Sequence, residues 1–590
     1  MRRGMLNVGS RYGRFITATI LAFAAGPMVG CAMQSGGGTD DSQTATQNEF
    51  ISVPLATVPT FVAHSGAVTI TIQDETAEVY INAADSSLMV NGVQAIDHST
   101  TPPTVAIAAG AKANIKSITI ADTMGMAGDV VILNYVNGLF GQGTHAAAAT
   151  AVNFKTSLAN SFVIKGTPNG NYIAFGATGI TLNNLLATPT IDITATNVTT
   201  YDVYLGAGND KFTAGGNSAI GAAFTHAVSV YGGPGNDTLV EGTTSTPGET
   251  FSGGPGIDTV DYSARTAAVS VAIDPLGVIT SGAGPTATGD PTQGATEGDV
   301  ILDADVIKGG TGNDQLMGGL TGAVTLNGGL GNDLFAEGDD TYNGGTETIQ
   351  GGGGTDTVDY SLRTHSLVIA LDGATASGDP HGNSGAGEKD IVGTDVSNVK
   401  WGGTATMTTA TVTGNSLDNV FTPGAGTNAI FGLAGDDTML EGADANNNGN
   451  DTFHGGTGTD TVDYSSRTND LTVTMDDHTA SGDTVNGEAD VIDMDVENLY
   501  GGSGADTLTG NALDNDIEGN AGNDVLAGLA GNDTLVGAAA SGSMEANNLH
   551  GNNVLDAAEP GAFNMCINVG LGMGATPASV GSANCELVQN

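Results

Sequence analysis

Acidic side chains recur at a fixed interval between Gly501 and Gly537, where the chain reads GGSGADTLTGNALDNDIEGNAGNDVLAGLAGNDTLVG. In units of nine residues, each unit opens with glycine, carries an acidic or amide residue at its sixth position and a large apolar residue at its eighth. Carboxylate oxygens at a regular interval can coordinate a hard metal cation. The apolar residues at the eighth positions are Leu508, Ile517, Leu526 and Leu535.

The other positions of each unit predict the element that holds the carboxylate. Glycines at the first, second and fourth positions predict a sharp loop, because positive φ angles are resisted by a Cβ. Asn520 at a second position fits this loop, since asparagine tolerates the left-handed region. Leu433 and Leu529 indicate that the second position is less strict than the fourth. The last three residues predict a short strand with its apolar side chain in a narrow core.

Stacking of these units would bring carboxylates together. Two units form a coil of about 18 residues, so Gly501 and Gly519 would lie above one another about 4.8 Å apart. Carboxylates at about 5 Å repel by roughly 1 kcal/mol in water and by up to about 3 kcal/mol at an effective dielectric of about 20. Over about ten loops the repulsion is on the order of 10 kcal/mol, comparable to the stability of a domain. We therefore expect a cation between the loops, Ca²⁺ rather than Mg²⁺, because Ca²⁺ accepts six to eight oxygens in flexible geometry.

Composition excludes several classes of protein. The chain of 590 residues has 64 acidic against 15 basic residues and a formal net charge of −49, which excludes nucleic acid as a partner. Glycine contributes 91 residues and aromatic residues only 5%, so a thick aromatic core cannot form. A thin core that is stacked along one dimension fits this composition.

The N-terminus predicts export. Residues 1–30 carry four arginines, no acidic residue and then an apolar stretch too short to span a bilayer comfortably, as in a secretory signal peptide. They end in Met28-Val29-Gly30-Cys31, which resembles a bacterial lipobox and implies a lipid anchor on Cys31. Residues 31–49 suit a flexible tether. Ala32 favours the outer membrane and cell surface, and ordinary cleavage with release of a secreted protein is the alternative.

Two further cysteines lie near the C-terminus. In an exported protein the pair Cys566 and Cys585 is expected to form a disulfide within a cap of residues 541–590. Such a bridge would contribute about 3 kcal/mol. Two free thiols are the alternative.

Residues 50–200 contain short alternating runs such as AVTITIQ and AEVYINA, which predict strands without the loop motif. This β-rich region is either a metal-free lead-in to the repeats or a separate β-sandwich. The segment THAAAATAVNFKTSLAN could form a helix, which favours a separate module.

A longer repeat is superimposed on the short one. The segments DTVDYSARTAAVSVAID, DTVDYSLRTHSLVIALD and DTVDYSSRTNDLTVTMD begin at Asp258, Asp356 and Asp460, about a hundred residues apart, and we call them the cassettes. Each is followed by an acidic stretch: EGDVILDAD, EKDIVGTD or EADVIDMD. After the second cassette WGGTATMTTATVTGN stands where the third has YGGSGADTLTGN, which predicts the loss of one metal site.

The cassettes carry the three arginines that follow the signal peptide, Arg265, Arg363 and Arg467. They could contact a ligand. The favoured interpretation is an ion pair with nearby carboxylates, such as those of Asp261, Asp359 and Asp463.

Residues 201–540 resemble the repeats-in-toxin (hemolysin-type) calcium-binding family, on the strength of the GGxGxD motif. The resemblance implies an all-β parallel β-roll with Ca²⁺ bound along both edges, although family toxins use a C-terminal export signal. It implies ligands from backbone carbonyls of the loops that begin at Gly232, Gly253, Gly309, Gly328, Gly351, Gly432, Gly455, Gly501, Gly519 and Gly528. It also implies ligands from the sixth-position residues, here called the loop aspartates: Asp210, Asp237, Asp258, Asp314, Asp333, Asp356, Asp437, Asp460, Asp506, Asp524 and Asp533.

Other motifs are weak or missing. The run Asp444 to Asp451, DANNNGND, resembles an EF-hand loop but has Gly455 at the twelfth position in place of glutamate, so it is interpreted as an acidic loop. The sequence contains neither HExxH nor GxSxG, the signatures of zinc proteases and of many serine hydrolases.

The sequence therefore predicts a non-enzymatic, calcium-binding protein of the cell surface, structural or adhesive, with surface polysaccharide or other surface proteins as possible partners. The alternative is an enzyme with a catalytic module in residues 50–200, where the titratable groups His64, Asp97, His98 and His145 are dispersed. A third hypothesis, a flat threonine array that binds ice or polysaccharide, is disfavoured because the threonines are intermittent.

Overall fold

The computed structural model contains strands and loops and, within the residues that it describes, no helix. No helix long and apolar enough to cross a membrane is found among those residues. The described residues are 60–64, 67–72, 76–81, 88–90, 93–94, 117–122, 130–135, 151–182, 191–243, 248–273, 278–281, 299–317, 322–338, 345–380, 387–402, 409–444, 449–537, 548–550, 554–556 and 565–567.

Among the residues that the structure describes, eleven strands precede the first loop motif. They are β1 (Thr60–His64), β2 (Ala67–Ile72), β3 (Thr76–Ile81), β4 (Leu88–Val90), β5 (Val93–Gln94), β6 (Ser117–Asp122), β7 (Val130–Asn134), β8 (Ala151–Lys165), β9 (Tyr172–Gly176), β10 (Gly179–Leu182) and β11 (Ile193–Tyr204).

The later strands form five mostly parallel ladders. Ladder A continues from β9 through β12 (Lys211–Thr213), β14 (Thr238–Val240), β16 (Thr259–Asp261), β20 (Val306–Lys308), β22 (Gly322–Leu330), β24 (Gly345–Gly353) and β27 (Ile391–Val392). Ladder B continues from β11 through β13 (Val228–Tyr231), β15 (Thr250–Ser252) and β19 (Val300–Leu302), with β18 (Val278–Ser281) antiparallel to β19.

The remaining ladders begin inside the cassettes. Ladder C comprises β17 (Ser270–Ile273), β21 (Gln315–Met317), β23 (Leu334–Ala336), β25 (Thr357–Tyr360), β28 (Asn398–Trp401), β30 (Val420–Thr422), β32 (Thr438–Leu440), β34 (Thr461–Asp463), β38 (Asn498–Tyr500), β40 (Asp516–Glu518), β42 (Thr534–Val536) and β44 (Val554–Asp556). Ladder D comprises β26 (Leu367–Ala370), β29 (Thr409–Thr413), β31 (Thr427–Ala434), β33 (Thr452–Thr457) and β37 (Val491–Ile492). Ladder E comprises β35 (Leu471–Thr474), β39 (Thr507–Thr509), β41 (Val525–Ala527), β43 (Asn548–His550) and β45 (Met565–Ile567), with β36 (Gly482–Asp483) antiparallel to β35.

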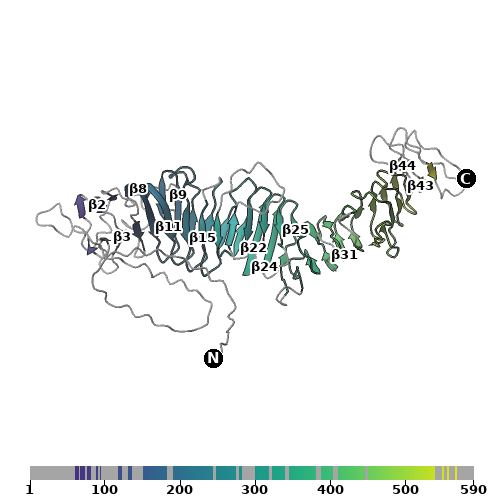
Figure 1. Cartoon of the computed structure of the whole chain (residues 1–590), viewed down its shortest axis with the longest axis horizontal. Coiled ribbons are helices and arrows are strands. Elements are labelled where there is room, and N and C mark those ends of the chain that lie inside the picture. Colours follow the sequence, from purple (N-terminus) through teal and green to yellow (C-terminus); the bar gives the residue numbers. More distant parts are fainter. Residues whose placement is uncertain are drawn as a thin grey trace, which may run out of the picture. The chain divides into compact units, whose positions relative to one another are not determined.

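Each cassette therefore opens a new ladder. Strands β16, β25 and β34 continue an existing ladder, whereas β17, β26 and β35, which follow them directly, begin ladders C, D and E. Figure 1 shows strands of these ladders following one another in chain order. The all-β parallel β-roll that the family resemblance implied is confirmed.

Each short repeat strand contributes one apolar side chain to the core. The central residue of each short strand is buried, as for Leu239 in β14 and Val260 in β16. All four residues predicted from the eighth position, Leu508 to Leu535, are fully buried as well. Short strands of alternating burial thus supply a narrow interior, as the small aromatic content requires.

The region before the loops pairs directly with the repeats. Strand β8 pairs in parallel with β11, β11 with β13, and β9 with β12, so strands of residues 151–204 continue into ladders A and B. The predicted helix is wrong over residues 151–160, which lie in β8. Pairing of β8 with β6 and β11 overrides the weak helical preference of its alanines.

Candidate calcium-binding loops

The loop aspartates are all buried at the ends of the repeat loops, with at most 2% of each residue exposed. Hydrogen bonds connect successive members. The backbone N–H of Asp210 donates to Oδ1 of Asp237 at 2.8 Å, and that of Asp237 donates to Oδ1 of Asp258 at 2.8 Å. The same bond joins Asp314 to Asp333, Asp333 to Asp356, Asp437 to Asp460, and Asp506 to Asp524. The structure thus brings the predicted carboxylates into rows.

The spacing along these rows follows the sequence prediction in part. Asp506 and Asp524, in the loops that begin at Gly501 and Gly519, are 18 residues apart and in adjacent coils, as predicted. Other coils are longer, with 23 residues between Asp333 and Asp356.

Residues other than aspartate occupy some positions in the rows. Asn419 and Asn515, in the reduced loops, donate their N–H groups to Asp437 at 2.8 Å and Asp533 at 3.1 Å. At the first and third cassettes the next acceptor lies in or just after the acidic stretch. The backbone N–H of Asp258 donates to Oδ2 of Asp305 at 2.7 Å, and that of Asp460 donates to Oε2 of Glu497 at 2.8 Å. Sequence analysis did not select Asp305 or Glu497, since neither lies in a GGxGxD motif.

The second carboxylate oxygen of most loop aspartates has no hydrogen-bond partner among the described residues. Uncompensated burial of a carboxylate oxygen is costly, so these atoms fit a bound cation. Asp314 and Asp506 differ, because their Oδ2 atoms accept hydrogen bonds. Oδ2 of Asp314 accepts the N–H of Gly310 at 2.5 Å, and Oδ2 of Asp506 accepts the N–H of Gly502 at 2.8 Å. The unpartnered oxygens are Oδ2 of Asp210, Asp237, Asp258, Asp333, Asp356, Asp437 and Asp460.

The ten loop-opening glycines leave room for these oxygens. At Gly232, Gly455 and the other eight predicted positions, an added Cβ would lie within 2.7 Å of Oδ2 of the aspartate in the same loop. The carbonyls of Gly232 and Gly253 accept N–H groups from the adjacent coil at 3.1 and 2.9 Å. Each carbonyl oxygen keeps a second lone pair that a cation could use.

The second loop position adopts the left-handed conformation in most of the loops, with or without glycine. Its φ angle is 96° at Gly233, 58° at Asn520, 81° at Leu433 and 67° at Leu529. Leucine therefore occupies this position in a conformation that disfavours a side chain by roughly 1–2 kcal/mol.

Burial shifts the titration of the loop carboxylates. Desolvation, with a smaller contribution from neighbouring aspartates, raises the pKa of Asp237 and Asp333 from 3.8 to about 7. It likewise raises the pKa of Asp460 to about 7. The groups whose pKa burial raises to about 6 are Asp210, Asp258, Asp314 and Asp437. A cation would be needed to hold the whole row ionised at neutral pH.

The cassette arginines form ion pairs, but with other partners than predicted. Arg265 contacts Glu241 at 3.2 Å, Arg363 contacts Glu337 and Glu388, and Arg467 contacts Glu441 and Glu488 at 3.0 and 2.5 Å.

The predicted partners have another role. Asp261, Asp359 and Asp463 instead accept N–H groups two residues ahead, from serines 263, 361 and 465.

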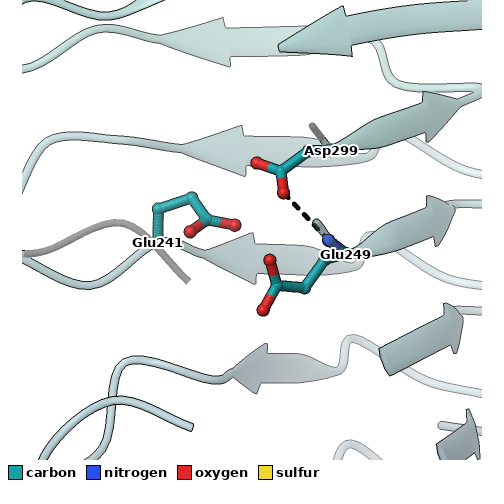
Figure 2. A group of neighbouring side chains, drawn as sticks. All are labelled: Glu241, Glu249 and Asp299. Carbon is teal, nitrogen blue, oxygen red and sulfur yellow. Dashed lines mark hydrogen bonds between the residues drawn. The ribbon is translucent and has the colours of Figure 1, made fainter. Parts of the chain in front are cut away.

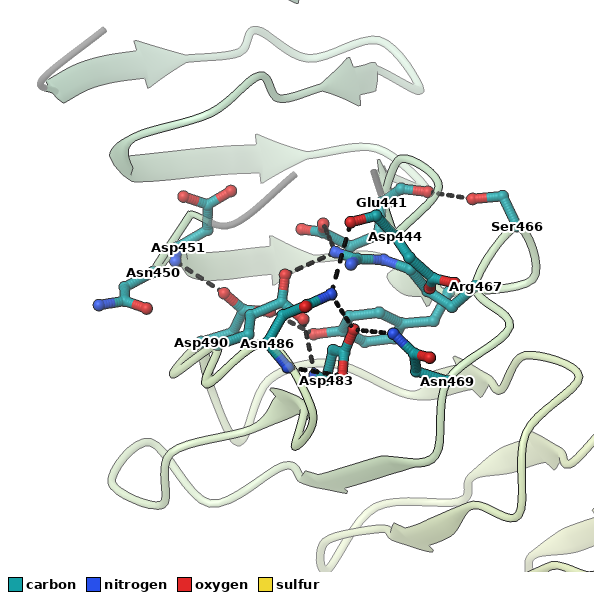
Figure 3. Close-up of polar contacts among 12 residues, drawn as sticks. Glu441, Asp444, Asn450, Asp451, Ser466, Arg467, Asn469, Asp483, Asn486 and Asp490 are labelled. Atoms are coloured by element: carbon teal, nitrogen blue, oxygen red, sulfur yellow. Dashed lines mark hydrogen bonds and ion pairs between the residues drawn. The ribbon is translucent and has the colours of Figure 1, made fainter. Parts of the chain in front are cut away.

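A signal in the sequence could have identified the true partners. Glu241, Glu337 and Glu441 each follow a motif strand directly and precede glycine, in DTLVEG, DLFAEG and DTMLEG. Figure 3 shows the arrangement around Arg467, with Asp490 and Asp451 close by. Burial and the neighbouring carboxylates raise the pKa of Asp490 well above its ordinary value.

Several predicted features lie outside the described residues. They include Cys31, the side chains of Cys566 and Cys585, the altered loop after the second cassette (residues 403–408), and the side chains of His64, Asp97, His98 and His145. Of the EF-hand-like run, Asp444 accepts the N–H of Thr468 at 3.0 Å, whereas Asp451 accepts that of Asn428 at 3.0 Å. These two ends therefore contact different strands or turns.

Comparison with known families agrees with this geometry. The family model of the RTX calcium-binding nonapeptide repeat (4 copies) matches residues 302–320, 413–446, 447–466, 495–512 and 509–541. The fold and these segments define a β-roll protein with RTX calcium-binding repeats. The loops at Gly232, Gly253, Gly328 and Gly351 lie outside the matched segments but share the same hydrogen-bonded rows. The comparison with curated proteins gives no match.

Proposed function

We propose that this chain is a non-enzymatic structural protein of the cell exterior whose roll folds when Ca²⁺ binds along its loop aspartates. The observation that carries the proposal is the row of buried carboxylates whose Oδ2 atoms have no donor among the described residues, as at Asp237, Asp333 and Asp437. Ca²⁺ would supply positive charge and accept six to eight oxygen ligands.

The residues of the chain would make this binding cooperative. Most loop aspartates accept, through Oδ1, a backbone N–H of the neighbouring loop, so fixing one loop orients the carboxylate of the next. At low free calcium inside the cell the carboxylates repel each other and the roll stays loose. At millimolar calcium outside the cell the same row becomes a rigid scaffold. These steps make export and folding compatible.

The location and role belong to the same proposal. Residues 1–30 would direct export, Cys31 would carry the lipid anchor and residues 31–49 would hold the roll away from the outer membrane. An adhesive or matrix role, with surface polysaccharide or other surface proteins as partners, suits a long polyanionic scaffold. Metabolic labelling with palmitate tests the anchor: the native chain should be labelled, and Cys31→Ser should not. Equal labelling of both would contradict it.

The calcium proposal is tested with two adjacent aspartates. Asp437 is fully buried with an unpartnered Oδ2, whereas Asp436 is exposed in the same loop. In a calcium titration followed by far-UV circular dichroism, Asp437→Asn should raise the midpoint concentration roughly two- to tenfold, about 0.4–1.4 kcal/mol. The control Asp436→Asn removes the same charge and should change it less. Equal shifts for both variants would reduce the effect to net charge and overturn the assignment of loop ligands.

A further inference from the structure

Each cassette encloses a cluster of buried acidic side chains that are not loop aspartates. In the first, Glu241, Glu249 and Asp299 point toward one another from neighbouring strands (Figure 2), and each offers one oxygen within 4.8 Å of the others. Clusters of three buried carboxylates also lie at the other two cassettes, with a glutamate of the later acidic stretch in the place of Glu249. The clusters there are Glu337, Glu388 and Asp390, and Glu441, Glu488 and Asp490.

The same hydrogen bonds hold the aspartate of each cluster. In the third cluster, the Tyr464 hydroxyl donates to Oδ2 of Asp490 at 2.8 Å and the Asp451 N–H donates to Oδ1 at 2.8 Å. Both oxygens accept a hydrogen bond, which fixes the carboxylate in one orientation. The equivalent donors are Tyr262 and the Glu249 N–H for Asp299, and Tyr360 and the Glu347 N–H for Asp390.

Charge within these clusters is unbalanced. In the second cluster Glu337, Glu388 and Asp390, with Glu347 beside them, are each at least 96% buried around the fully buried Arg363, with exposures of 3, 4, 0 and 2%. The guanidinium contacts Glu337 at 3.7 Å and also Glu388. When ionised, four carboxylates against one guanidinium leave three negative charges, which a divalent cation would reduce to one.

Carboxylate oxygens without a hydrogen-bond partner among the described residues indicate where a cation would bind. Oε1 of Glu337, a residue only 3% exposed, has no hydrogen-bond partner among the described residues. Beside the third cluster the same holds for Oδ2 of Asp451, which is 1% exposed and whose N–H donates to Asp490. A buried carboxylate oxygen without a donor is costly, and a metal ion is the partner that would satisfy it together with the adjacent carboxylates.

We propose that the cassette clusters are a second class of Ca²⁺ site, buried inside the roll and separate from the repeat loops. The ligands are all carboxylates, and a tyrosine hydroxyl donates a hydrogen bond to one of them. Such a set of oxygen ligands suits a hard cation. Such a site would tie the residue that follows β14, β23 or β32 to the residue that precedes β19, β27 or β37, the last strands of ladders B, A and D, so the ion would stabilise the point where a ladder ends. This inference is independent of the loop assignment.

Counting bound ions tests the proposal. The chain from residue 32 to 590 is dialysed against ⁴⁵Ca²⁺, native and as the double variant Glu337→Gln/Glu441→Gln, which keeps side-chain volume. The double variant should lose about two ions per chain, one per altered cluster, while loop binding remains. Glu518→Gln, a strand glutamate outside the clusters, is the control and should lose none. An unchanged count in a folded double variant overturns the proposal.

A second readout leaves every carboxylate in place. Tb³⁺ replaces Ca²⁺, and tyrosine excitation sensitises its emission at short range. Because the Tyr464 hydroxyl contacts a proposed ligand, Tyr464→Phe should lower the sensitised emission, whereas Tyr204→Phe, in the stacked Tyr204–Tyr231 pair, should lower it less. Equal emission from both variants overturns the third site even if the double variant fails to fold. A normal calcium-induced β signal in that case leaves the loop proposal intact.

Discussion

Residues 151–224 and residues 409–537 both stack most of their strands in parallel but fill the interior differently. In the first region Phe175 contacts Tyr201, Phe212 and Phe224, with ring centroids 5.7, 5.3 and 5.2 Å apart. In the second region most short strands bury one aliphatic side chain, and buried aspartates follow at the loops. If the loops bind Ca²⁺ as proposed, one architecture is held by apolar packing in the first region and by cations in the second.

Removing calcium should produce the largest difference in amide protection between the two regions. In EDTA, amides of β39 to β42 should exchange with deuterium at nearly the rate of an unfolded chain, because the carboxylates repel and the aliphatic core is thin. Amides of β8 and β11 should stay protected. Hydrogen exchange read by mass spectrometry checks this, and equal protection of both regions in EDTA would break the distinction.

The aromatic cluster should matter regardless of calcium. Phe175→Ala should lower the free energy of unfolding of residues 151–224 by about 3–5 kcal/mol, because it leaves a cavity among packed rings. The loss should be the same in EDTA and in calcium, as measured by denaturant unfolding. Ile191→Ala, at a residue 38% exposed, is the control and should cost much less. A loss that appears only in EDTA would contradict independent packing.

Lowering the pH should stabilise the metal-free loops but weaken their binding of calcium. The raised pKa values, about 7 at Asp237 and Asp460, mean that the metal-free fold is stabilised below about pH 4 and loses that stability as pH rises through about 6–7. In EDTA, acidification should therefore increase the β signal of the repeats. With calcium, protons compete for the same oxygens, so the calcium midpoint should rise as pH falls from about 7.5 to 5.5. Circular dichroism at each pH checks both signs; a calcium midpoint independent of pH would remove these carboxylates from the site.

The smallest expected effect concerns loop strain. Leu433→Gly and Leu529→Gly should each stabilise the calcium-bound roll by about 1 kcal/mol, because both leucines have positive φ and are half exposed. The calcium-bound melting temperature checks this. Leu362→Gly, at an exposed leucine without positive φ, should not stabilise. Destabilisation by both loop variants would show that those side chains contribute contacts that outweigh the strain.

Local periodicity explains what the sequence could predict. The spacing of Leu508, Ile517 and Leu526 predicts strands with one buried face, and the sixth-position aspartates are predicted to stack because the coil length sets their neighbours. Both features depend on residues within a coil or two. The segment THAAAATAVNFKTSLAN misled the prediction over residues 151–160, because the pairing partners of β8 in β6 and β11 lie far away in the chain.

The cassette clusters could not be predicted in the same way. Glu337, Arg363 and Asp390 come together from segments about 25 residues apart, across a change of ladder that no nine-residue period encodes. The arginine was expected to pair with Asp359, its neighbour in sequence, but the coil turns that carboxylate toward the Ser361 N–H. Arg363 pairs instead with the buried carboxylates of Glu337 and Glu388.

The most direct test of the central claim is far-UV circular dichroism of residues 32–590 in EDTA, titrated with CaCl₂ and separately with MgCl₂. We predict a cooperative gain of β signal with Ca²⁺ and little with Mg²⁺, added to a constant signal from the aromatic-packed region. A full β signal already present in EDTA at neutral pH would contradict the account, because the loop aspartates would then be buried in a roll that needs no cation.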